Sequence, residues 1–488
     1  MIEEQTTKES AGKSPAAYSG KLSLENLETV SAWGGASDGV SYVYRPTTVD
    51  QLYELLILAK ESGRSLGLRG GGNSYGDAAL NNENILLDMR RMNRILMWDP
   101  ENGIIKLEPG VTISQLWQYA LEDGWWPPVV TGTSKTTIGG CVAMNVHGKN
   151  AYQVGPIGDH ILDFELMLPS GEIITCSRDE NRELFFAAVG GFGMLGIFTA
   201  ISLQLKRVYS GLLEVQTQTQ PDLEGMFTYF EEYVDQSDYI VGWIDSFTRG
   251  SALGRGDVHR ANYLAPGADL APSQTLRLDN QHLTPNMFGI VPRSIIWIMM
   301  RPFMNNLGTA LINMAKYQAG RLGGSKRFRQ PHAAFHFLLD YVPDWKNAYG
   351  PGGLIQYQPF IPKETAHDAF ADLLRLCQRR GLPNYLTVFK RHRPDEFLMT
   401  HSLDGFSLAM DFRITDDRRS RVASLARELD EIVLAAGGRF YFAKDSTLRP
   451  QVAQAYLGQN VIDQFNALKQ RNDPNNLLQT DLWRRIFA

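Results

Sequence analysis

The feature that most constrains this chain is a run of nine residues, RGGGNSYGD, at positions 69–77. Three consecutive glycines follow an arginine, and Asn73 and a further glycine, Gly76, come soon after. Glycine loses more conformational freedom on folding than any other residue, so such a run needs a structural reason. Two reasons are available: a backbone with positive φ, or a group that must come close to the main chain.

Two further segments share this composition. Residues 131–150 read TGTSKTTIGGCVAMNVHGKN, and residues 190–196 read GGFGMLG. Three glycine-rich loops set between strands predict a long ligand whose polar parts meet exposed backbone N–H groups. The spacing matches neither G-x-G-x-x-G after a strand nor G-x-x-x-x-G-K-[ST], so dinucleotide-binding Rossmann and Walker sites are excluded.

Composition narrows the class of protein. The chain has 488 residues, 43% of them hydrophobic, which is enough for two or three domains with substantial cores. A formal net charge of -5 provides no basic surface, so nucleic acid is not expected as a partner. The three cysteines have no C-x-x-C spacing, so we predict neither a disulfide framework nor a metal site.

The residues up to Val208 predict an α+β domain. Short apolar runs alternate with glycines, as in SLGLRGG, NILLDM, GIIKLEPG and GIFTAISLQLKRV, and these are expected to be strands. Helical periods cover residues 48–62, with Thr48 as a possible cap, and residues 112–123.

After Val208 the pattern changes, and a domain boundary is expected near Arg207. Strands are predicted in GLIQYQPFIP, YLTVFKR and FSLAMDFRI, and helices over residues 363–380 and 417–436. Strands and helices of this size predict a sheet covered by helices.

Residues 1–20 are polar and lack the apolar core of a signal peptide, so we predict a disordered tail and a cytoplasmic protein. The segment from Phe288 to Tyr317 is the most apolar, but Arg293, Arg301 and Pro302 interrupt it, so no membrane span is expected. Two interpretations stay open: an amphipathic segment at the membrane surface, and a buried pair of helices.

The glycine loops resemble the FAD-binding loops of the vanillyl-alcohol-oxidase family, also called the PCMH type. The resemblance rests on RGGGNSYGD, TGT followed by TTIGGCVAMNVHGKN, and GGFGMLGI. It implies that the first loop holds the FAD diphosphate and that the other two follow the rest of the cofactor. Many members attach FAD covalently through a histidine where this chain has Asn73, so we expect non-covalent FAD. The implied cofactor-binding residues are Arg69, Gly70, Gly71, Gly72, Asn73, Ser74, Tyr75, Gly76, Asp77, Gly132, Thr133, Thr137, Ile138, Gly139, Gly140, Met144, His147, Gly148, Lys149, Asn150, Gly196, Ile197 and Tyr441.

Within that family the chain is most similar to the decaprenylphosphoryl-β-D-ribose 2'-oxidases. SYGD, HGKN, WIDS, AYGPGGLIQYQ, VFK and GGRFYFAKDS carry this resemblance in order along both halves of the chain. It implies an FAD-binding domain of two subdomains at 21–208, completed by a C-terminal segment at 437–488. A substrate domain at 209–436, built on an antiparallel sheet flanked by helices, is inserted between them.

The same resemblance assigns the site. Lys444, Tyr441 and His147 are the expected catalytic residues, and Gln356, Gln358, Lys390, Lys149 and Lys444 the expected substrate contacts. From the residues alone, Lys444 could equally form an ion pair with Asp445, and Lys390 could be solvated. Gln356 and Gln358 are two apart, so on one strand their side chains point the same way.

Three residues of the second half are expected to contribute no catalytic group. His392 and His401 read as solvated loop histidines. Mycobacterial members carry a cysteine at the position of Ala409, so this chain lacks that thiol.

These residues predict an FAD-dependent oxidoreductase that oxidises a sugar secondary hydroxyl to a ketone. The resemblance implies the 2'-OH of a polyprenyl-phosphate-linked pentose, or a related glycoside, in polysaccharide biosynthesis. Oxidation would then be the first half of an epimerisation completed by a separate short-chain reductase. The apolar segment from Phe288 to Tyr317 fits peripheral contact with a membrane. Two alternatives remain: an aldonolactone or alditol oxidase that uses O2, and a flavin-binding protein without catalysis.

Overall fold

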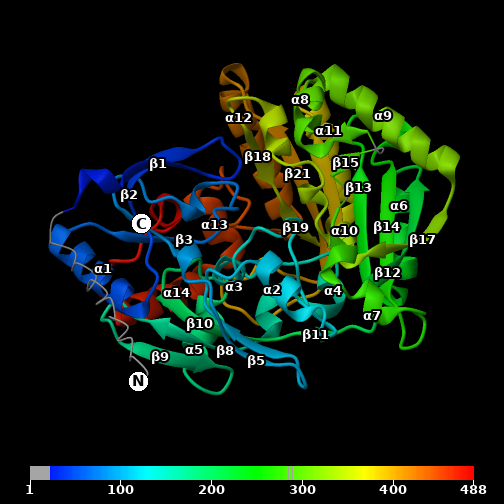
Figure 1. Cartoon of the computed structure of the whole chain (residues 1–488). Helices are drawn as coiled ribbons and strands as arrows, with labels where there is room; N and C mark the ends of the chain where they lie inside the picture. Colours follow the sequence, from blue (N-terminus) through cyan, green and yellow to red (C-terminus); the bar gives the residue numbers. More distant parts are fainter. Residues whose placement is uncertain (1–21, 284, 288–289) are drawn as a thin grey trace, which may run out of the picture.

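The computed structural model describes residues 22–283, 285–287 and 290–488, so the tail predicted for residues 1–20 lies outside the described residues. The chain combines helices and sheets, in agreement with the predicted α+β class (Figure 1). Three sheets account for most of the strands, two of them at the N-terminal end of the chain and one large sheet beside them.

A four-stranded sheet lies next to the first glycine run. Its strands, in spatial order, are β1 (Leu27–Ser31), β2 (Asp38–Tyr44), β4 (Ile85–Asp88) and β3 (Leu66–Arg69). The helix between β2 and β3 is α1 (Val49–Ser62). Its N-cap is Thr48, as predicted, and its C-cap is Gly63 at φ 64°. The first glycine loop, residues 69–77, starts at the end of β3.

A five-stranded antiparallel sheet carries the other two glycine loops. Its order is β5 (Ile95–Asp99), β6 (Ile104–Leu107), β10 (Ile197–Gln204), β8 (Ile161–Met167) and β9 (Ile173–Ser177). The helix predicted over residues 112–123 is α2 (Ile113–Ala120). Thr112 and Gln115 form a capping box at its N-terminus. The second glycine loop, residues 131–150, contains α3 (Ile138–Ala143); the third, residues 190–196, joins α5 (Arg182–Ala188) to β10.

The largest sheet is antiparallel and has nine strands. Its order is β17 (Lys326–Pro331), β12 (Leu212–Gln220), β14 (Gly256–Tyr263), β13 (Tyr239–Ile244), β20 (Leu386–His392), β21 (Gly405–Arg413), β19 (Pro359–Pro362) and β22 (Arg439–Phe440), with β18 (Leu354–Tyr357) also paired to β21. The strands predicted in GLIQYQPFIP, YLTVFKR and FSLAMDFRI are confirmed as β18 with β19, β20, and β21. β22 belongs to the expected C-terminal segment but extends this sheet by pairing with β19.

One face of the nine-stranded sheet is covered by helices. These are α6 (Leu223–Tyr233), α11 (Lys363–Arg379) and α12 (Asp416–Ala435), the last two close to the predicted ranges (Figure 1). Phe389 of β20 packs against this layer, with ring centroids 4.7 Å from Phe230 and 5.0 Å from Phe227. Because side chains alternate along a strand, its neighbours Val388 and Lys390 point to the opposite face.

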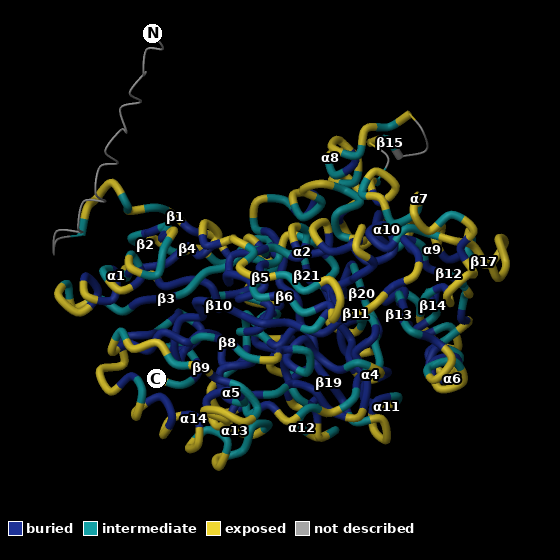
Figure 2. Tube along the Cα trace, turned by 60° about the horizontal axis from the view of Figure 1, so that its bottom comes forward, coloured by how far each residue is buried: buried dark blue, intermediate teal, exposed yellow. Residues whose placement is uncertain are grey.

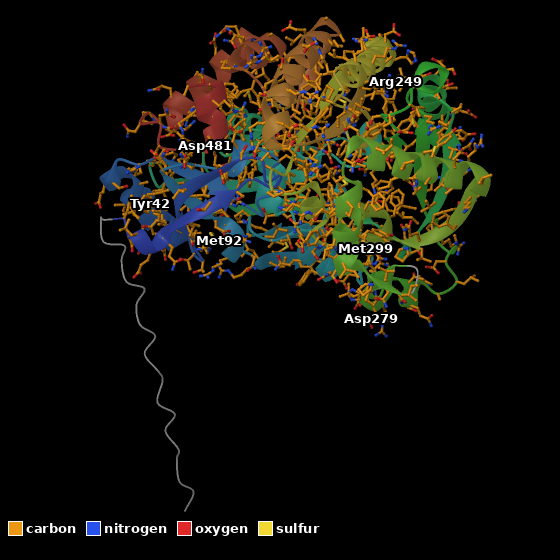
Figure 3. The ribbon with its side chains drawn as sticks, turned by 90° about the horizontal axis from the view of Figure 1, so that it is seen from above. Tyr42, Met92, Arg249, Asp279, Met299 and Asp481 are labelled. Atoms are coloured by element: carbon orange, nitrogen blue, oxygen red, sulfur yellow. The ribbon has the colours of Figure 1, made fainter. Side chains whose placement is uncertain are left out.

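The C-terminal helices return to the N-terminal sheet. They are α13 (Pro450–Leu457), α14 (Gln459–Asn472) and α15 (Asp481–Ile486). Leu478 forms a bridge with Leu66 of β3, and the Asn82 N–H donates to the Asp481 carboxylate at 3.0 Å. Figure 3 places Tyr42 and Asp481 at the same end of the molecule.

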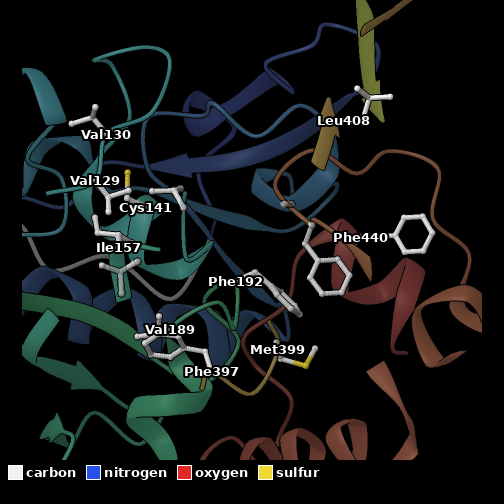
Figure 4. Close-up of a cluster of buried hydrophobic side chains, with 14 of the residues drawn as sticks. Val129, Val130, Cys141, Ile157, Val189, Phe192, Phe397, Met399, Leu408 and Phe440 are labelled. Atoms are coloured by element: carbon white, nitrogen blue, oxygen red, sulfur yellow. The ribbon is translucent and has the colours of Figure 1, made fainter. Parts of the chain in front are cut away.

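A hydrophobic core connects the sheets. One continuous cluster of buried side chains includes Cys141 of the second glycine loop, Phe192 of the third, and Leu408 and Phe440 of the nine-stranded sheet (Figure 4). The glycine loops are therefore held against the large sheet by apolar contacts.

The apolar segment that includes most of Phe288 to Tyr317 lies at the surface. It forms α8 (Ile296–Met300) and α9 (Asn306–Gly323) at an edge of the molecule (Figure 2). The segment is therefore not the buried pair of helices that was one of the two interpretations. The exposed apolar side chains here are Ile295, Ile298, Met299, Phe303, Leu307, Leu311, Ile312 and Met314. In the described residues, no helix is long and apolar enough to cross a bilayer.

The first prediction concerns the ion pair that joins the two ends of the chain. Arg485 of α15 donates to both carboxylate oxygens of Asp77 and to Asp445, each at 2.7 Å. Arg485→Ala leaves two half-buried carboxylates unpaired, so we expect the free energy of unfolding in urea to fall by about 2–4 kcal/mol. Arg471→Ala removes the exposed pair with Glu183 and should cost under about 1 kcal/mol. Equal losses in the two variants would contradict this account.

Candidate active site

A cavity of about 600 Å³ lies between the three glycine loops and the uncovered face of the nine-stranded sheet. This volume is within the range of roughly 300–1,000 Å³ found for cofactor and substrate sites. The predicted residues that line it are Arg69, Gly70, Gly71, Gly72, Asn73, Ser74, Tyr75, Gly132, Thr133, Thr137, Gly139, Gly140, Met144, His147, Lys149, Ile197, Gln356, Gln358, Lys390, Tyr441 and Lys444.

The first glycine loop packs directly on the second. A Cβ on Gly70 would lie 2.1 Å from the Thr137 hydroxyl oxygen, and one on Gly71 would lie 2.6 Å from the Lys135 carbonyl oxygen. The Gly71 N–H donates to the same Thr137 hydroxyl at 3.2 Å. The group that approaches these glycines closely is therefore another loop of the protein. This contact comes in addition to the ligand expected from the sequence.

Several backbone donors of the first loop remain free. Throughout the described part of the chain, no acceptor is found for the N–H groups of Gly70, Gly72, Asn73 and Ser74. All four residues line the cavity. Successive free N–H groups form a site that suits an anion such as a diphosphate.

Six of the predicted cofactor contacts do not line the cavity and instead support its walls. They are Gly76, Asp77, Ile138, Gly148, Asn150 and Gly196. A Cβ on Gly76 would lie 1.9 Å from the Asp445 carbonyl oxygen, so this glycine lets the first loop meet the segment that carries Lys444. The Asn150 amide donates to the Pro128 carbonyl at 2.8 Å, which fixes the second loop.

Lys444 stands at the wall of the cavity with its ammonium group 3.8 Å from the centre of the Tyr75 ring. Asp445 bonds Arg485, so the alternative ion pair between Lys444 and Asp445 is not formed. Burial lowers the pKa of Lys444 to about 7, an effect that the negative charge of Asp411 opposes and the positive charge of Lys390 reinforces. Lys444 can therefore change its charge near neutral pH.

His147 is a neutral imidazole. Its Nε2 lies 3.1 Å from the Gln358 amide nitrogen, which can only donate, so Nε2 accepts and Nδ1 carries the proton. Nδ1 is buried and has no partner among the described residues. Burial, followed by the positive charge of Lys390, holds the pKa of His147 well below its ordinary value. Nδ1 therefore lies inside the wall and not at the surface that a ligand in the cavity would meet.

The prediction that His392 and His401 are solvated loop residues is wrong. They are 1% and 4% exposed, and their ring centroids lie 4.8 Å and 5.5 Å from that of His147. His392 Nε2 lies 2.7 Å from the Ser407 hydroxyl. The position of His392 could have been read from the strand pattern, because it is two residues after Lys390 on β20. Among the described residues, no group of three or more His, Cys, Asp or Glu side chains is arranged so that it could hold a metal ion.

The large sheet and two helical segments beside it contribute further cationic and aromatic groups that sequence reasoning missed. Trp243, His259, Lys316 and His336 also line the cavity. Lys316 of α9 lies 2.9 Å from Asp257 and 3.4 Å from the centre of the Trp243 ring. Contacts of this kind join elements that are distant in the sequence, so no local sequence pattern predicts them.

Lys149 and Lys390 differ in how they are held. The Lys149 ammonium donates to the carbonyl oxygens of Phe335 and His336, the latter at 3.2 Å. The Lys390 ammonium group has no hydrogen-bond or ion-pair partner in the described residues, and burial is the one cause acting on its pKa. Burial lowers the pKa of Lys390 to about 8. Lys390 is thus available to a ligand in the cavity, whereas Lys149 is held by the protein.

Comparison with known proteins agrees with this geometry. The family described as the FAD binding domain matches residues 40–177, which contain the first two glycine loops. The chain carries an FAD-binding domain. FAD is therefore its cofactor, as the glycine loops predict. The free N–H groups of the first loop, whose residues line the cavity, fit such a ligand.

Relatives of this FAD-binding domain are oxidoreductases. Over 459 residues the chain is 27% identical to decaprenylphosphoryl-beta-D-ribose oxidase of Mycolicibacterium smegmatis, which covers 93% of this chain and 96% of the relative. It is 26% identical over 456 residues to L-gulonolactone oxidase of Bos taurus, at 91% and 94% coverage. A third relative is D-arabinono-1,4-lactone oxidase of Yarrowia lipolytica, 25% identical over 46% of this chain and 43% of that protein. The chain is thus an FAD-dependent oxidoreductase.

The packing of the glycine loops makes a prediction about FAD affinity. In Gly71→Ala the new Cβ must displace the Lys135 carbonyl, which moves the donors of the first loop. We expect FAD affinity to fall at least about tenfold, measured by fluorescence quenching as FAD is titrated into stripped protein. Gly323→Ala is the control, because its Cβ meets only the flexible end of Lys326. Unchanged affinity in Gly71→Ala would contradict the assignment.

Asn73 makes a second prediction. An amide nitrogen forms no bond to the flavin, so acid precipitation should release all of the yellow colour into the supernatant. Colour that stays with the precipitated polypeptide would show a covalent link elsewhere in the chain.

Proposed function

We propose that this protein oxidises a secondary hydroxyl of a sugar to a ketone, and that its substrate is a polyprenyl-phosphate-linked pentose oxidised at the 2'-OH, or a related glycoside. What carries the proposal is the charge of the cavity. Five basic side chains line it, and in the described residues no aspartate or glutamate does: Arg69, Lys149, Lys316, Lys390 and Lys444. Burial lowers the pKa of all four lysines, so an anion in the cavity would favour their charged form. Such a wall suits ligands with more than one anionic group.

The proposed roles follow from the positions of the side chains. When bound, FAD would supply the hydride-acceptor chemistry that oxidation of the carbinol carbon requires. Lys444 offers a cation whose charge adjusts near neutral pH, so it stabilises negative charge gained in the reaction or takes the hydroxyl proton. Tyr441 packs beside His147, with ring centroids 5.4 Å apart, and shapes the same wall. Gln356 and Gln358 both line the cavity and bind vicinal hydroxyls of the sugar.

The phosphate of the substrate is assigned to Lys390 and its neighbours. Lys390 has lost part of its hydration without gaining a protein partner, so an anion is the ligand that would stabilise it most.

The residues of 209–436 form the proposed substrate domain, and 437–488 complete the proposed FAD-binding domain.

The lipid part rests on the apolar surface of α8 and α9. Met299 and Leu307 are 56% and 72% exposed there, while Lys316 of the same α9 lines the cavity. An isoprenoid chain leaving the cavity would meet this surface, and peripheral membrane contact follows from the same residues. The separate short-chain reductase that would complete the epimerisation belongs to this proposal.

A second candidate is an aldonolactone oxidase that uses O2, because two relatives carry lactone oxidase names. The cation-lined wall favours an anionic substrate over a neutral lactone. A flavin-binding protein without catalysis is the third possibility, and the polar groups that converge on the cavity disfavour it, because burying them without a ligand is costly.

Anaerobic reduction of the bound flavin tests the proposal. Polyprenyl-phosphate ribose in detergent should bleach the visible absorption band, whereas methyl riboside and L-gulono-1,4-lactone should not. Lys390→Met should lower kcat/KM for the lipid phosphate about 10- to 100-fold, equivalent to roughly 1.4–2.8 kcal/mol. Bleaching by the lactone with release of hydrogen peroxide would favour the second candidate. A flavin that stays oxidised throughout would favour the third.

A further inference from the structure

Gln358 uses both hydrogens of its side-chain amide inside the protein. Its nitrogen lies 3.1 Å from His147 Nε2 and donates to the Ser407 hydroxyl oxygen at 3.3 Å. An amide nitrogen carries two hydrogens, so these two acceptors occupy both of them. The nitrogen therefore has no hydrogen left for a ligand.

The carbonyl oxygen of Gln358 is the polar atom that remains. Gln358 lines the cavity although most of the residue is buried. Within the described residues no group donates to its Oε1, and this atom is not sealed inside the protein. The oxygen can therefore accept a hydrogen bond from a ligand in the cavity.

A second hydrogen bond holds the Ser407 hydroxyl. Its oxygen lies 2.7 Å from His392 Nε2. Because that oxygen already accepts from Gln358, the hydroxyl hydrogen is donated to His392 Nε2, and His392 Nδ1 carries the ring proton. Burial, reinforced by the positive charge of Lys390, holds the pKa of His392 well below its ordinary value, so the ring is neutral and able to accept.

The strands place Ser407 and His392 next to the cavity but not at its surface. Ser407 lies on β21 two residues from Ala409, and His392 lies on β20 two residues from Lys390. Ala409 and Lys390 line the cavity, whereas the hydroxyl and the imidazole do not. Residues two apart share a face of a sheet, so the two buried groups continue the wall beyond the end of the cavity. They reach a ligand only through Gln358.

The four groups have one other consistent arrangement, in which every hydrogen bond is reversed. His392 Nε2–H would then donate to Ser407, and Ser407 and His147 would both donate to the Gln358 carbonyl. The amide nitrogen would face the cavity instead of the oxygen. Turning the amide alone would leave acceptors facing each other, which is costly inside a protein. The four groups are therefore oriented together.

We propose that Ser407 and His392 are positioning residues for Gln358: they hold its amide nitrogen inside the wall, so that its carbonyl oxygen accepts a hydrogen bond from a hydroxyl of the substrate. The inference rests on the proposed function, because it takes Gln358 as a contact of the sugar. It adds the chemistry that this contact selects. A hydroxyl supplies the hydrogen that the oxygen needs, whereas an ether or a fluorine at the same place does not.

Nuclear magnetic resonance of the histidine ring nitrogens tests the orientation without any substrate. In FAD-loaded protein labelled with nitrogen-15 histidine, His147 and His392 should both carry their proton on Nδ1. Their signals are assigned as those that disappear in His147→Gln and His392→Phe. In Ser407→Ala the Gln358 amide loses one of its two acceptors, so part of the His147 population should change to the Nε2–H form.

Anaerobic reduction of the flavin by polyprenyl-phosphate ribose in detergent measures the consequence for the substrate. Ser407→Ala and His392→Phe should each raise KM about 5- to 10-fold with a smaller change in kcat, the effect of one misaligned hydrogen bond. In a Gln358→Leu background, Ser407→Ala should raise KM no further, because Gln358 is the group through which Ser407 acts.

Ser202→Ala is the matched control. Ser202 is a buried serine on β10 whose hydroxyl donates to Asp163 at 2.8 Å, and it does not line the cavity. The substitution removes the same group from another strand. Both the histidine signals and KM should stay at their wild-type values.

The outcomes separate this inference from the proposed function. A proton on Nε2 of either His147 or His392 in the wild type overturns the inference, and so do losses that add fully in Ser407→Ala with Gln358→Leu. A flavin that polyprenyl-phosphate ribose does not reduce overturns the proposed function, and the ring protons of the two histidines then decide the orientation of Gln358. Should Ser407→Ala fail to fold, His392→Phe takes its place in both measurements.

Discussion

The contact between bare backbone at Gly70 and Gly71 and the second glycine loop is the constraint on which the site depends. Because no Cβ intervenes, the Thr137 hydroxyl and the Lys135 carbonyl reach the first loop directly. The loop is fixed from one side, and its next N–H groups stay free on the other. The same loop is tied further along to the Lys444 segment, since the Tyr75 N–H donates to the Ala443 carbonyl at 2.9 Å. The N–H groups that could bind an anion and the segment that carries Lys444 are therefore joined by a backbone hydrogen bond.

The nine-stranded sheet uses its two faces for opposite tasks. On β20, Phe389 closes an aromatic layer under α6 and α11, while Val388 and Lys390 line the cavity. Because side chains alternate along a strand, β20 supplies a rigid apolar anchor on one face and a cavity-lining lysine on the other. The aromatic layer holds β20 in position. The opposite face of the strand can then carry polar groups such as Lys390, whose partial burial would otherwise destabilise the fold.

Local patterns predicted much of this structure. The caps at Thr48 and Thr112, the strands β18 to β21 and the ligand-binding character of the glycine loops follow from short-range rules. The surroundings of single side chains did not follow from them. His392 and His401 look polar and exposed in sequence, yet they are buried around Phe360, a residue of a different strand. Gly76 and Asn150 belong to motifs of the glycine loops but support the walls, because a motif does not say which of its residues face the ligand.

The electrostatics of the cavity link cofactor, substrate and lysine chemistry. Five basic side chains line the wall, and two carboxylates that act on them, Asp257 and Asp411, do not line it. Positive charge in a poorly hydrated cavity is costly until anions enter, so binding of a diphosphate and of a second phosphate would each relieve part of that cost. The same burial brings the pKa of Lys444 to about 7 and that of Lys390 to about 8. An incoming anion raises the pKa of a nearby lysine. Because the cavity buries both lysines, the binding of an anionic ligand is therefore coupled to the protonation of Lys444 and Lys390.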